Sequence, residues 1–360
     1  MMMRPRTGHT HNRRWGVEGL LLLALLLAAP PGRAESKPGQ PGPDPTASPA
    51  PAAAQDPAAR TEEKPRMEIY GFAMMDMGYE TGQTDPNWFD VLRPTKLPAF
   101  ENEYGADGHY FAGVRQSRLG VKGFIPTSAG EIKTIFEFEL FGTGVDAGQT
   151  TFRLRHAWGE LGQVGAGQTW SPFMDIDVFP NSIEYWGPNG MVFFRNVQLR
   201  WTPWSRGDSR FAIALERPGA SADQGVYAGR IELQDVSARF PLPDLSAHFR
   251  KAGDFGHVQF SGIVRQIKWD DLNDDKFDLT GSTTGWGLHA SSNLKLGKNV
   301  ARLSVVYGAG IQNYMNDAPV DVGIENNFSN TRTPVLGKAL PMLGISAFLD
   351  LNWNAKWTST

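Results

Sequence analysis

Hydrophobic and charged residues alternate along the stretch from Gly130 to Trp170. Between residues 131 and 141, one face carries Ile132, Phe136, Phe138 and Leu140 and the other carries Glu131, Lys133, Glu137 and Glu139. After residues 142–148 the alternation resumes, with Phe152, Leu154 and Trp158 on one face and Arg153, Arg155 and Ala157 on the other. A period of two residues indicates β-strands. We therefore predict two neighbouring strands, each charged on its second face.

The length of the first strand favours a membrane setting. A core strand of a soluble β-sandwich would also alternate, so the alternation alone leaves that possibility open. The eleven residues 131–141, tilted by about 40°, rise by about 28 Å, which is close to the apolar band of an outer-membrane barrel. Strands of soluble domains are more often about five or six residues long. The pattern predicts an all-β protein, a transmembrane antiparallel β-barrel whose charged face lines a water-filled lumen.

The amino terminus has the pattern of an exported protein. Residues 1–34 begin with several arginines, continue with about ten apolar residues, and end on Gly32-Arg33-Ala34, as in a secretory signal peptide. The apolar run is too short to cross a bilayer as a helix. Residues 35–66 are rich in proline and alanine, which predicts a disordered periplasmic linker. It is either a plain spacer or a segment for cell-wall contact or assembly, and residues 67–360 are assigned to the barrel.

Further strands and their connections follow the same logic. We expect strands at residues 67–79, 110–124, 191–201, 209–216, 245–250, 257–269, 282–294, 299–314 and 343–353. Short turns at 126–130, 161–164 and 203–208 alternate with long connections such as 142–150 and 171–190, an asymmetry typical of outer-membrane barrels. Residues 226–243 are assigned mostly to a long loop. The total is about twelve strands, an even number.

The carboxy-terminal residues 349–360 resemble the hairpin at residues 293–303, but they stop just after its turn. A barrel that ended there would leave an unpaired strand edge in lipid, where unsatisfied backbone groups cost several kcal/mol each. We therefore expect a carboxy-terminal truncation that lacks the closing strands.

Composition and motifs exclude several kinds of chemistry. The net charge of −3 argues against a nucleic-acid partner, and the absence of cysteine excludes disulfides, thiolate metal sites, a cysteine nucleophile and a lipoprotein anchor. The histidines at 156, 248, 257 and 289 lack metal-ligand spacing, and neither a Gly-x-Ser-x-Gly elbow nor a phosphate loop occurs. Residues 270–276 resemble a calcium loop, but Lys276 stands where the turn needs glycine, which favours a solvated outer loop. We expect no catalytic residue, metal or cofactor.

Several segments together carry a family resemblance. They are Arg115–Gly123, Gly130–Gly142, Phe152–Leu161 and Gly167–Asp175, continued by Gly187–Arg195 and Phe255–Gln259. In this order they resemble the DcaP-like outer-membrane porin family, from residue 67 to the end. The resemblance implies a trimeric diffusion porin in the outer membrane of a Gram-negative cell, with sixteen strands and a loop folded into each barrel. On that template about four strands are missing here. It also implies contact with lipid and lipopolysaccharide and passage of small anionic solutes such as dicarboxylates. The proline-rich linker stands where a known member carries a helical coiled coil.

Four basic residues on neighbouring strands are candidates for one wall of the pore. Arg118 and Lys122 lie four apart on one strand face, and Arg153 and Arg155 follow on the neighbouring hairpin. Such a basic ladder would concentrate carboxylates in a narrow, water-filled constriction. The alternative is that these cations pair with Glu131, Glu137 and Glu139 across the lumen.

The insertion at residues 171–190 is the candidate for the inward-folded loop. Its carboxylates Asp175, Asp177 and Glu184 would face the basic wall and set the pore's width and selectivity, unless the segment is an ordinary exposed loop. Arg195 and Arg200, on the following strand, are weaker lumen candidates. The tryptophans at 158, 170, 201, 204 and 353 suit interfacial girdles, or alternatively packing within a core or between barrels.

The predicted function is a passive porin for small anions and not an enzyme. Two alternatives remain open from the residues alone. One is a barrel enzyme such as a lipase, for which no Ser/His/Asp constellation is legible. The other is a secreted or outer-membrane β-protein that binds carbohydrate through its tryptophans.

Overall fold

The fold is described from a computed structural model over residues 64–142, 151–182 and 186–360. The predicted signal peptide and almost all of the linker therefore lie outside the described residues, as does Glu184. The described residues form β-strands and short 3-10 helices, and none of their helices is long and apolar enough to cross a membrane.

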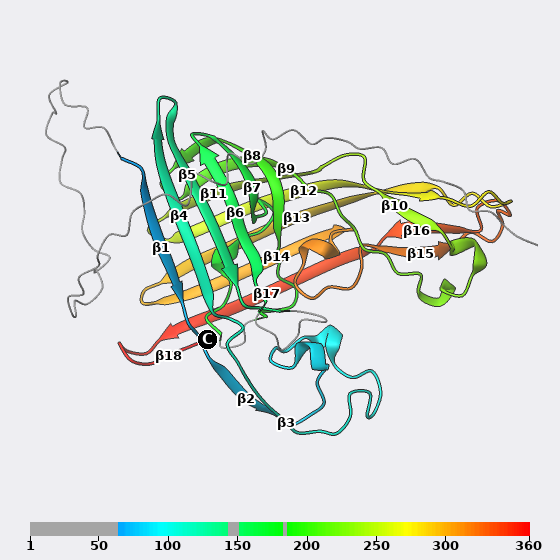
Figure 1. The fold of residues 1–360 in the computed structure, drawn as a ribbon, viewed down its shortest axis with the longest axis horizontal. Helices are drawn as coiled ribbons and strands as arrows, with labels where there is room; N and C mark the ends of the chain where they lie inside the picture. The colour runs from blue at the N-terminus through cyan, green and yellow to red at the C-terminus, as the bar shows by residue number, and fades with distance from the viewer. Residues whose placement is uncertain (1–63, 143–150, 183–185) are drawn as a thin grey trace, which may run out of the picture. The chain divides into compact units, whose positions relative to one another are not determined.

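One large antiparallel sheet dominates the structure (Figure 1). In spatial order its strands are β1 (Arg66–Phe72), β4 (Arg118–Thr127), β5 (Gly130–Glu139), β6 (Arg153–Leu161), β7 (Val164–Trp170), β8 (Arg195–Arg206), β9 (Ser209–Glu216), β11 (Asp244–Gly253), β12 (Gly256–Asp271), β13 (Gly281–Leu296), β14 (Asn299–Ala309), β17 (Pro341–Asn352) and β18 (Thr358–Ser359). The short β10 (Val236–Arg239) pairs with the far end of β12. This confirms the predicted all-β class and the antiparallel sheet.

Short turns and long connections alternate along this sheet. The turns between β4 and β5, β6 and β7, β8 and β9, β11 and β12, and β13 and β14 lie at one end of the strands, and the long connections 171–194, 217–243 and 310–340 leave the other end (Figure 1). This is the predicted asymmetry. Two hairpins stand apart from the large sheet, β2 (Asp76–Glu80) with β3 (His109–Gly113) and β15 (Val322–Asn326) with β16 (Val335–Ala339).

Two predicted strands are each broken in two. The strand expected at 67–79 is divided into β1 and β2, and the strand expected at 110–124 is divided into β3 and β4. The breaks face each other, because the Ser117 hydroxyl accepts a hydrogen bond from Met74 N (2.9 Å) and donates one to Met74 O (3.1 Å). The Ser117 side chain thus makes the hydrogen bonds to Met74 that a neighbouring strand's backbone would make in a regular sheet.

Two other predicted strands have different ends in the structure, and one hairpin was missed. The strand expected at 299–314 ends at Ala309, because Gly310 adopts φ +65° and the chain turns into a 3-10 helix, η9 (Gln312–Tyr314). Residues 191–194 precede β8, which then runs on to Arg206, so the turn expected at 203–208 contains only Gly207 and Asp208. The β15–β16 hairpin was not predicted.

A β-bulge in β6 changes which side chains share a face. Glu137 is opposite His156 and Phe138 is opposite Leu154, so Arg155 is an extra residue in β6. Arg155 and His156 are consequently both buried, and the alternation is inverted beyond them. Trp158 therefore shares the face of His156, and its predicted grouping with Phe152 and Leu154 was wrong.

The two faces of the sheet differ sharply. The outer face exposes large apolar side chains, among them Phe136, Leu199, Phe260, Leu288 and Ile345. The inner face buries ionic and polar groups, among them Glu137, Glu216, His248, Gln259 and Arg265. A sheet with apolar side chains on its exposed face and polar side chains on its inner face is typical of a β-barrel whose outer side contacts lipid.

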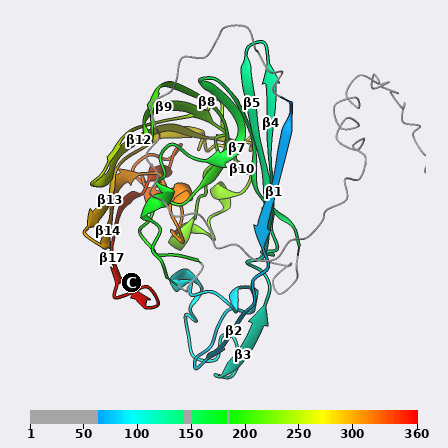
Figure 2. The same ribbon diagram turned by 90° about the vertical axis from the view of Figure 1, so that its left-hand side faces the viewer.

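An apolar core lies on the inner face. The connection between β7 and β8 contributes Phe173, Met174, Val178, Met191 and Val192 to it, and the connection after β14 contributes Ile311, Tyr314 and Met315. These residues pack on Ile263 of β12 and Val306 of β14. The sheet curves around these two connections (Figure 2). The described parts of the 171–190 insertion thus pack on the inner face of the sheet.

Candidate functional site

Arg155 is the centre of an ionic cluster on β5 and β6. Its Nε lies 2.6 Å from Glu137 Oε1, and its Nη1 lies 2.5 Å from Glu139 Oε2. Arg118 of β4 approaches the same two carboxylates at 3.6 and 3.9 Å, and Arg195 of β8 approaches Glu139 at 3.8 Å. The alternative prediction, in which these cations pair with carboxylates, therefore holds for Arg118 and Arg155. The pairs join side chains of neighbouring strands and do not cross a lumen.

The two other members of the predicted basic ladder remain exposed. Lys122 has its amino group 5.0 Å from the centre of the Tyr70 ring, and Arg153 has its guanidinium 6.0 Å from the Phe141 ring. Neither makes an ion pair with any described residue. Of the four predicted cations, Arg118 and Arg155 thus pair with carboxylates, whereas Lys122 and Arg153 make no ion pair with a described residue.

Asp175 and Asp177 of the 171–190 insertion have different partners from those expected. Asp175 accepts hydrogen bonds from His257 Nε2 (2.6 Å), Ser291 Oγ (2.7 Å) and Arg250 Nη1 (3.2 Å). Arg250 Nη2 also lies 2.5 Å from Asp177 Oδ2. The expectation that these carboxylates face Arg118, Lys122, Arg153 and Arg155 was wrong, because β11 and β12 supply the countercharge.

The Asp175 cluster is an ion-pair network and not a cation site. The ligand atoms of Asp175, Asp177 and His257 lie within 4.8 Å of one another, which is close enough for a metal. However, the Arg250 guanidinium already bridges the two carboxylates. Burial alone would raise the pKa of Asp175, but the hydrogen bond and charge of His257, the hydrogen bond from Ser291 and the charge of Arg250 outweigh it and lower that pKa to about 2.

Four of the predicted site residues meet in one pocket of about 250 Å³, which we call the Arg195 pocket. Its charged lining consists of Arg93, Arg153, Arg155 and Arg195 against Glu139 and Asp317. Arg93 comes from the 81–108 connection, a region in which no site residue was predicted. The pocket therefore holds more cations than carboxylates.

A second, larger pocket has a volume of about 700 Å³, and we call it the Arg200 pocket. Its charged lining consists of Lys133, Arg200 and Arg210 against Glu160. Arg200 donates from Nε to Gln198 Oε1 (3.0 Å) and its guanidinium lies 5.0 Å from the centre of the Trp158 ring. Arg210 Nε donates to His248 Nε2 (3.2 Å), and the other nitrogen of that imidazole donates to Pro172 O (3.1 Å).

The three cations of the Arg200 pocket make no ion pair with a residue that the structure describes. Lys133 and Arg210 were not among the predicted site residues. The alternation of Ser209–Glu216 does place Arg210 on the face of Glu216, but it does not tell which face is the inner one.

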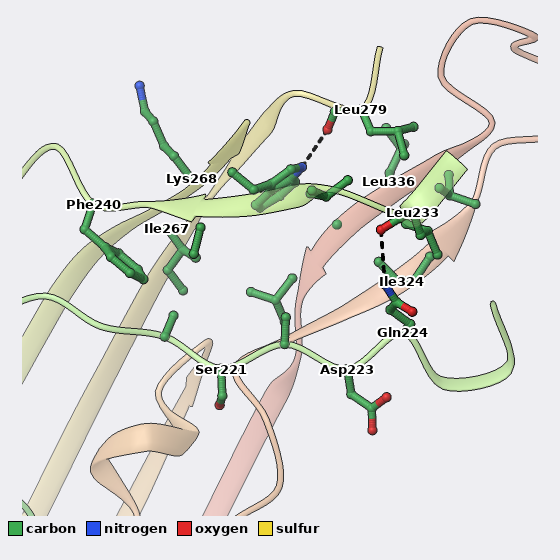
Figure 3. Close-up of a pocket in the computed structure, with 18 residues that line it drawn as sticks. Ser221, Asp223, Gln224, Leu233, Phe240, Ile267, Lys268, Leu279, Ile324 and Leu336 are labelled. Carbon is green, nitrogen blue, oxygen red and sulfur yellow. Dashed lines mark hydrogen bonds between the residues drawn. The ribbon is translucent and has the colours of Figure 1, made fainter. Parts of the chain in front are cut away.

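A third pocket, of about 370 Å³, has a different character (Figure 3). It lies between residues 220–240, the far end of β12, the connection that follows β12, and the β15–β16 hairpin. It is lined mainly by apolar side chains such as Leu233, Leu279 and Ile324. Asp223 and Lys268 belong to its lining but point away from its centre (Figure 3). It contains none of the predicted site residues, so we do not assign it to the candidate site.

An antiparallel sheet with an apolar exposed face and charged interior pockets defines an outer-membrane β-protein of the porin class. The crystal structure of the outer membrane channel DcaP of Acinetobacter baumannii has the same fold, with a TM-score of 0.65 and 18% identity over 82% of this chain and 76% of that chain. A loop-deletion mutant of OmpT, an outer membrane protein of Vibrio cholerae, is less similar, with a TM-score of 0.41 and 12% identity over 82% of this chain and 80% of that chain.

The family model of the DcaP outer membrane protein matches residues 63–319. The chain belongs to this family, which confirms the resemblance seen in the sequence. No curated protein matches the chain.

Proposed function

We propose that this outer-membrane porin is a passive channel for small anions. One observation carries the proposal: the Arg195 pocket and the Arg200 pocket both hold more cations than carboxylates. The Arg195 pocket has four arginines against Glu139 and Asp317, and the Arg200 pocket has three cations against Glu160. A net excess of positive charge in a confined, polar space raises the local concentration of anions and lowers that of cations.

The solute class that we propose is small carboxylates, with dicarboxylates as the specific candidates. The guanidinium group suits a carboxylate because its N–H groups match two carboxylate oxygens in one plane. Two basic pockets in one interior offer a dicarboxylate a partner for each end. The family resemblance supports the same class, and it also supports the proposal of a homotrimer surrounded by lipid and lipopolysaccharide and exported by the signal peptide.

The role of pore-lining cations falls on a different set of residues from the predicted ladder. Lys122, Arg153, Arg200 and Arg210 are the wall cations that we propose attract solutes. Arg118 and Arg155 instead hold the carboxylates of Glu137 and Glu139, so they shape the interior and balance its negative charge. Asp175 and Asp177 fix the inward connection to β11 and β12.

Reversal potentials in planar lipid bilayers test the proposal. Purified protein is recorded in a gradient of KCl, and we expect anion-selective channels. The Arg200→Gln/Arg210→Gln variant should lose most of that preference, whereas Lys251→Gln/Lys276→Gln removes the same charge outside both pockets and should leave it unchanged. Protein that inserts without conducting ions, or a wild-type channel that prefers cations, would refute the proposal. Heat-modifiable gel migration shows that each variant is folded.

A further inference from the structure

We infer that the indole of Trp170 is the partition between the Arg195 pocket and the Arg200 pocket, and that an anion passes from one to the other only when this ring moves. The inference rests on the proposed channel function and names the residue that limits it. Trp170 is the last residue of β7 and lines the Arg200 pocket. It therefore stands at the point where the chain leaves the sheet and turns into the inward connection.

The ring of Trp170 touches the other pocket through three of that pocket's lining residues. Its centre lies 4.9 Å from the guanidinium carbon of Arg195 and 5.6 Å from that of Arg155. The Phe193 ring is 5.5 Å away. Arg155, Phe193 and Arg195 all line the Arg195 pocket. The indole therefore borders the Arg200 pocket and also contacts two cations of the Arg195 pocket.

The backbone of Trp170 is held while its side chain remains half-buried. Its carbonyl accepts hydrogen bonds from Gln198 Nε2 (3.0 Å) and from Arg200. The His156 ring packs edge-on at 5.2 Å. Gln198 and Arg200 thus hold the end of β7 in place. The indole can therefore move only by rotation about its side-chain bonds, without displacement of β7.

Contacts between cations and the ring make the partition responsive to charge. A guanidinium group is attracted to the indole by the ring's negative face, and an anion bound to Arg195 competes for the same positive charge. A carboxylate that enters the Arg195 pocket therefore weakens the contacts that hold the ring in place. A neutral solute of the same size does not compete in this way and meets a closed partition.

A cysteine substitution tests the inference directly, because the native chain contains no cysteine. We expect the Trp170→Cys channel to have a single-channel conductance at least about twofold higher than the wild type, since the ring no longer obstructs the path. Benzyl methanethiosulfonate, which attaches an aromatic ring to the thiol through a disulfide, should return the conductance toward the wild-type value. The same reagent should not change the wild-type channel or Trp353→Cys, which carries its thiol at an exposed position outside both pockets.

The outcomes separate this inference from the proposed function. A wild type that does not conduct refutes the channel itself. A conducting wild type whose Trp170→Cys variant has unchanged conductance, or a raised conductance that the benzyl reagent does not lower, refutes the partition alone. If Trp170→Cys fails to fold, Trp170→Phe and Trp170→Leu take its place. The aromatic Phe variant should then conduct like the wild type and the Leu variant should conduct more, and equal conductance in the two would also refute the partition.

Discussion

Arg155 Nε donates to Glu137 Oε1 across 2.6 Å, from β6 to the neighbouring strand β5. Both side chains are buried, and the same guanidinium also pairs with Glu139. The bulge in β6 makes this geometry possible, because the extra residue turns Arg155 and His156 to the same face. A position that the alternation assigned to an open basic wall is therefore a structural ion pair.

Removing Arg155 should destabilise the protein strongly. The Arg155→Gln variant leaves Glu137 and Glu139 buried with less countercharge, and breaking a buried pair in this way costs about 3–5 kcal/mol. Thermal unfolding in detergent measures the effect. Arg153→Gln is the matched control, since Arg153 is exposed and without an ion pair among the described residues, and its effect should stay within about 0.5 kcal/mol. Equal losses in the two variants would contradict the assignment of Arg155 as a structural residue.

The Arg93–Asp317 contact should fasten the 81–108 connection. Arg93 Nε lies 2.8 Å from Asp317 Oδ1, Thr95 N donates to Oδ2 at 3.1 Å, and the guanidinium lies 4.0 Å from the Trp88 ring. We expect Arg93→Gln to increase the rate of trypsin cleavage after Lys96 severalfold, because local opening exposes this backbone. Fragment mass spectrometry locates the cut. Arg239→Gln removes an exposed ion pair elsewhere, and cleavage after Lys96 that is as fast in this variant would rule out a specific fastening role.

Asp175 should make the protein sensitive to strong acid. Its pKa is lowered to about 2, from 3.8. Ionised Asp175 therefore stabilises the folded protein by about 2 kcal/mol at any pH well above 3.8, the pKa of the carboxyl group in the unfolded chain. This stabilisation is lost as the pH falls toward the pKa of the folded state. We expect the melting temperature of the wild type to fall between pH 4 and pH 2 more steeply than that of Asp175→Asn, which lacks the titrating group. Parallel curves for the two proteins over this range would show that Asp175 does not contribute.

The periodicity of the chain was sufficient to predict the strands but not their irregularities. The alternation in β5 and in β12 extends through nearly the whole strand, and both were placed to within a few residues. The bulge at Arg155 depends on the register between two strands, and the alternation within one strand contains no information about it. The break at Ser117 likewise depends on a contact with Met74, 43 residues away.

The composition of the site was partly predictable, whereas its pairing was not. Arg195 and Arg200 could be selected because they are basic residues of the strand that follows the insertion. Which carboxylate each cation meets is decided by contacts that are distant in sequence, such as Arg250 with Asp175 and Arg93 with Asp317. Those partners come from connections whose path depends on the packing of Phe173, Met191 and Tyr314 on the inner face.

The bulge itself should depend on Gln168, a polar residue of the outer face of β7. Its Nε2 donates to the carbonyls of Leu154 and Arg155, each at 3.3 Å, which are the groups that the bulge removes from the regular ladder. In an apolar surrounding an unpaired carbonyl costs about 1–3 kcal/mol, so Gln168→Leu should lower stability by about that amount. Gln163→Leu is the control, because Gln163 donates to Pro203 O (3.3 Å) at an exposed turn where water can replace it. Thermal unfolding in detergent compares the two, and a control variant that loses as much stability as Gln168→Leu would show that the carbonyls at the bulge do not need this amide. A loss confined to Gln168→Leu would instead identify this amide as the group that stabilises the bulge and thereby keeps Arg155 and Trp158 on the inner face.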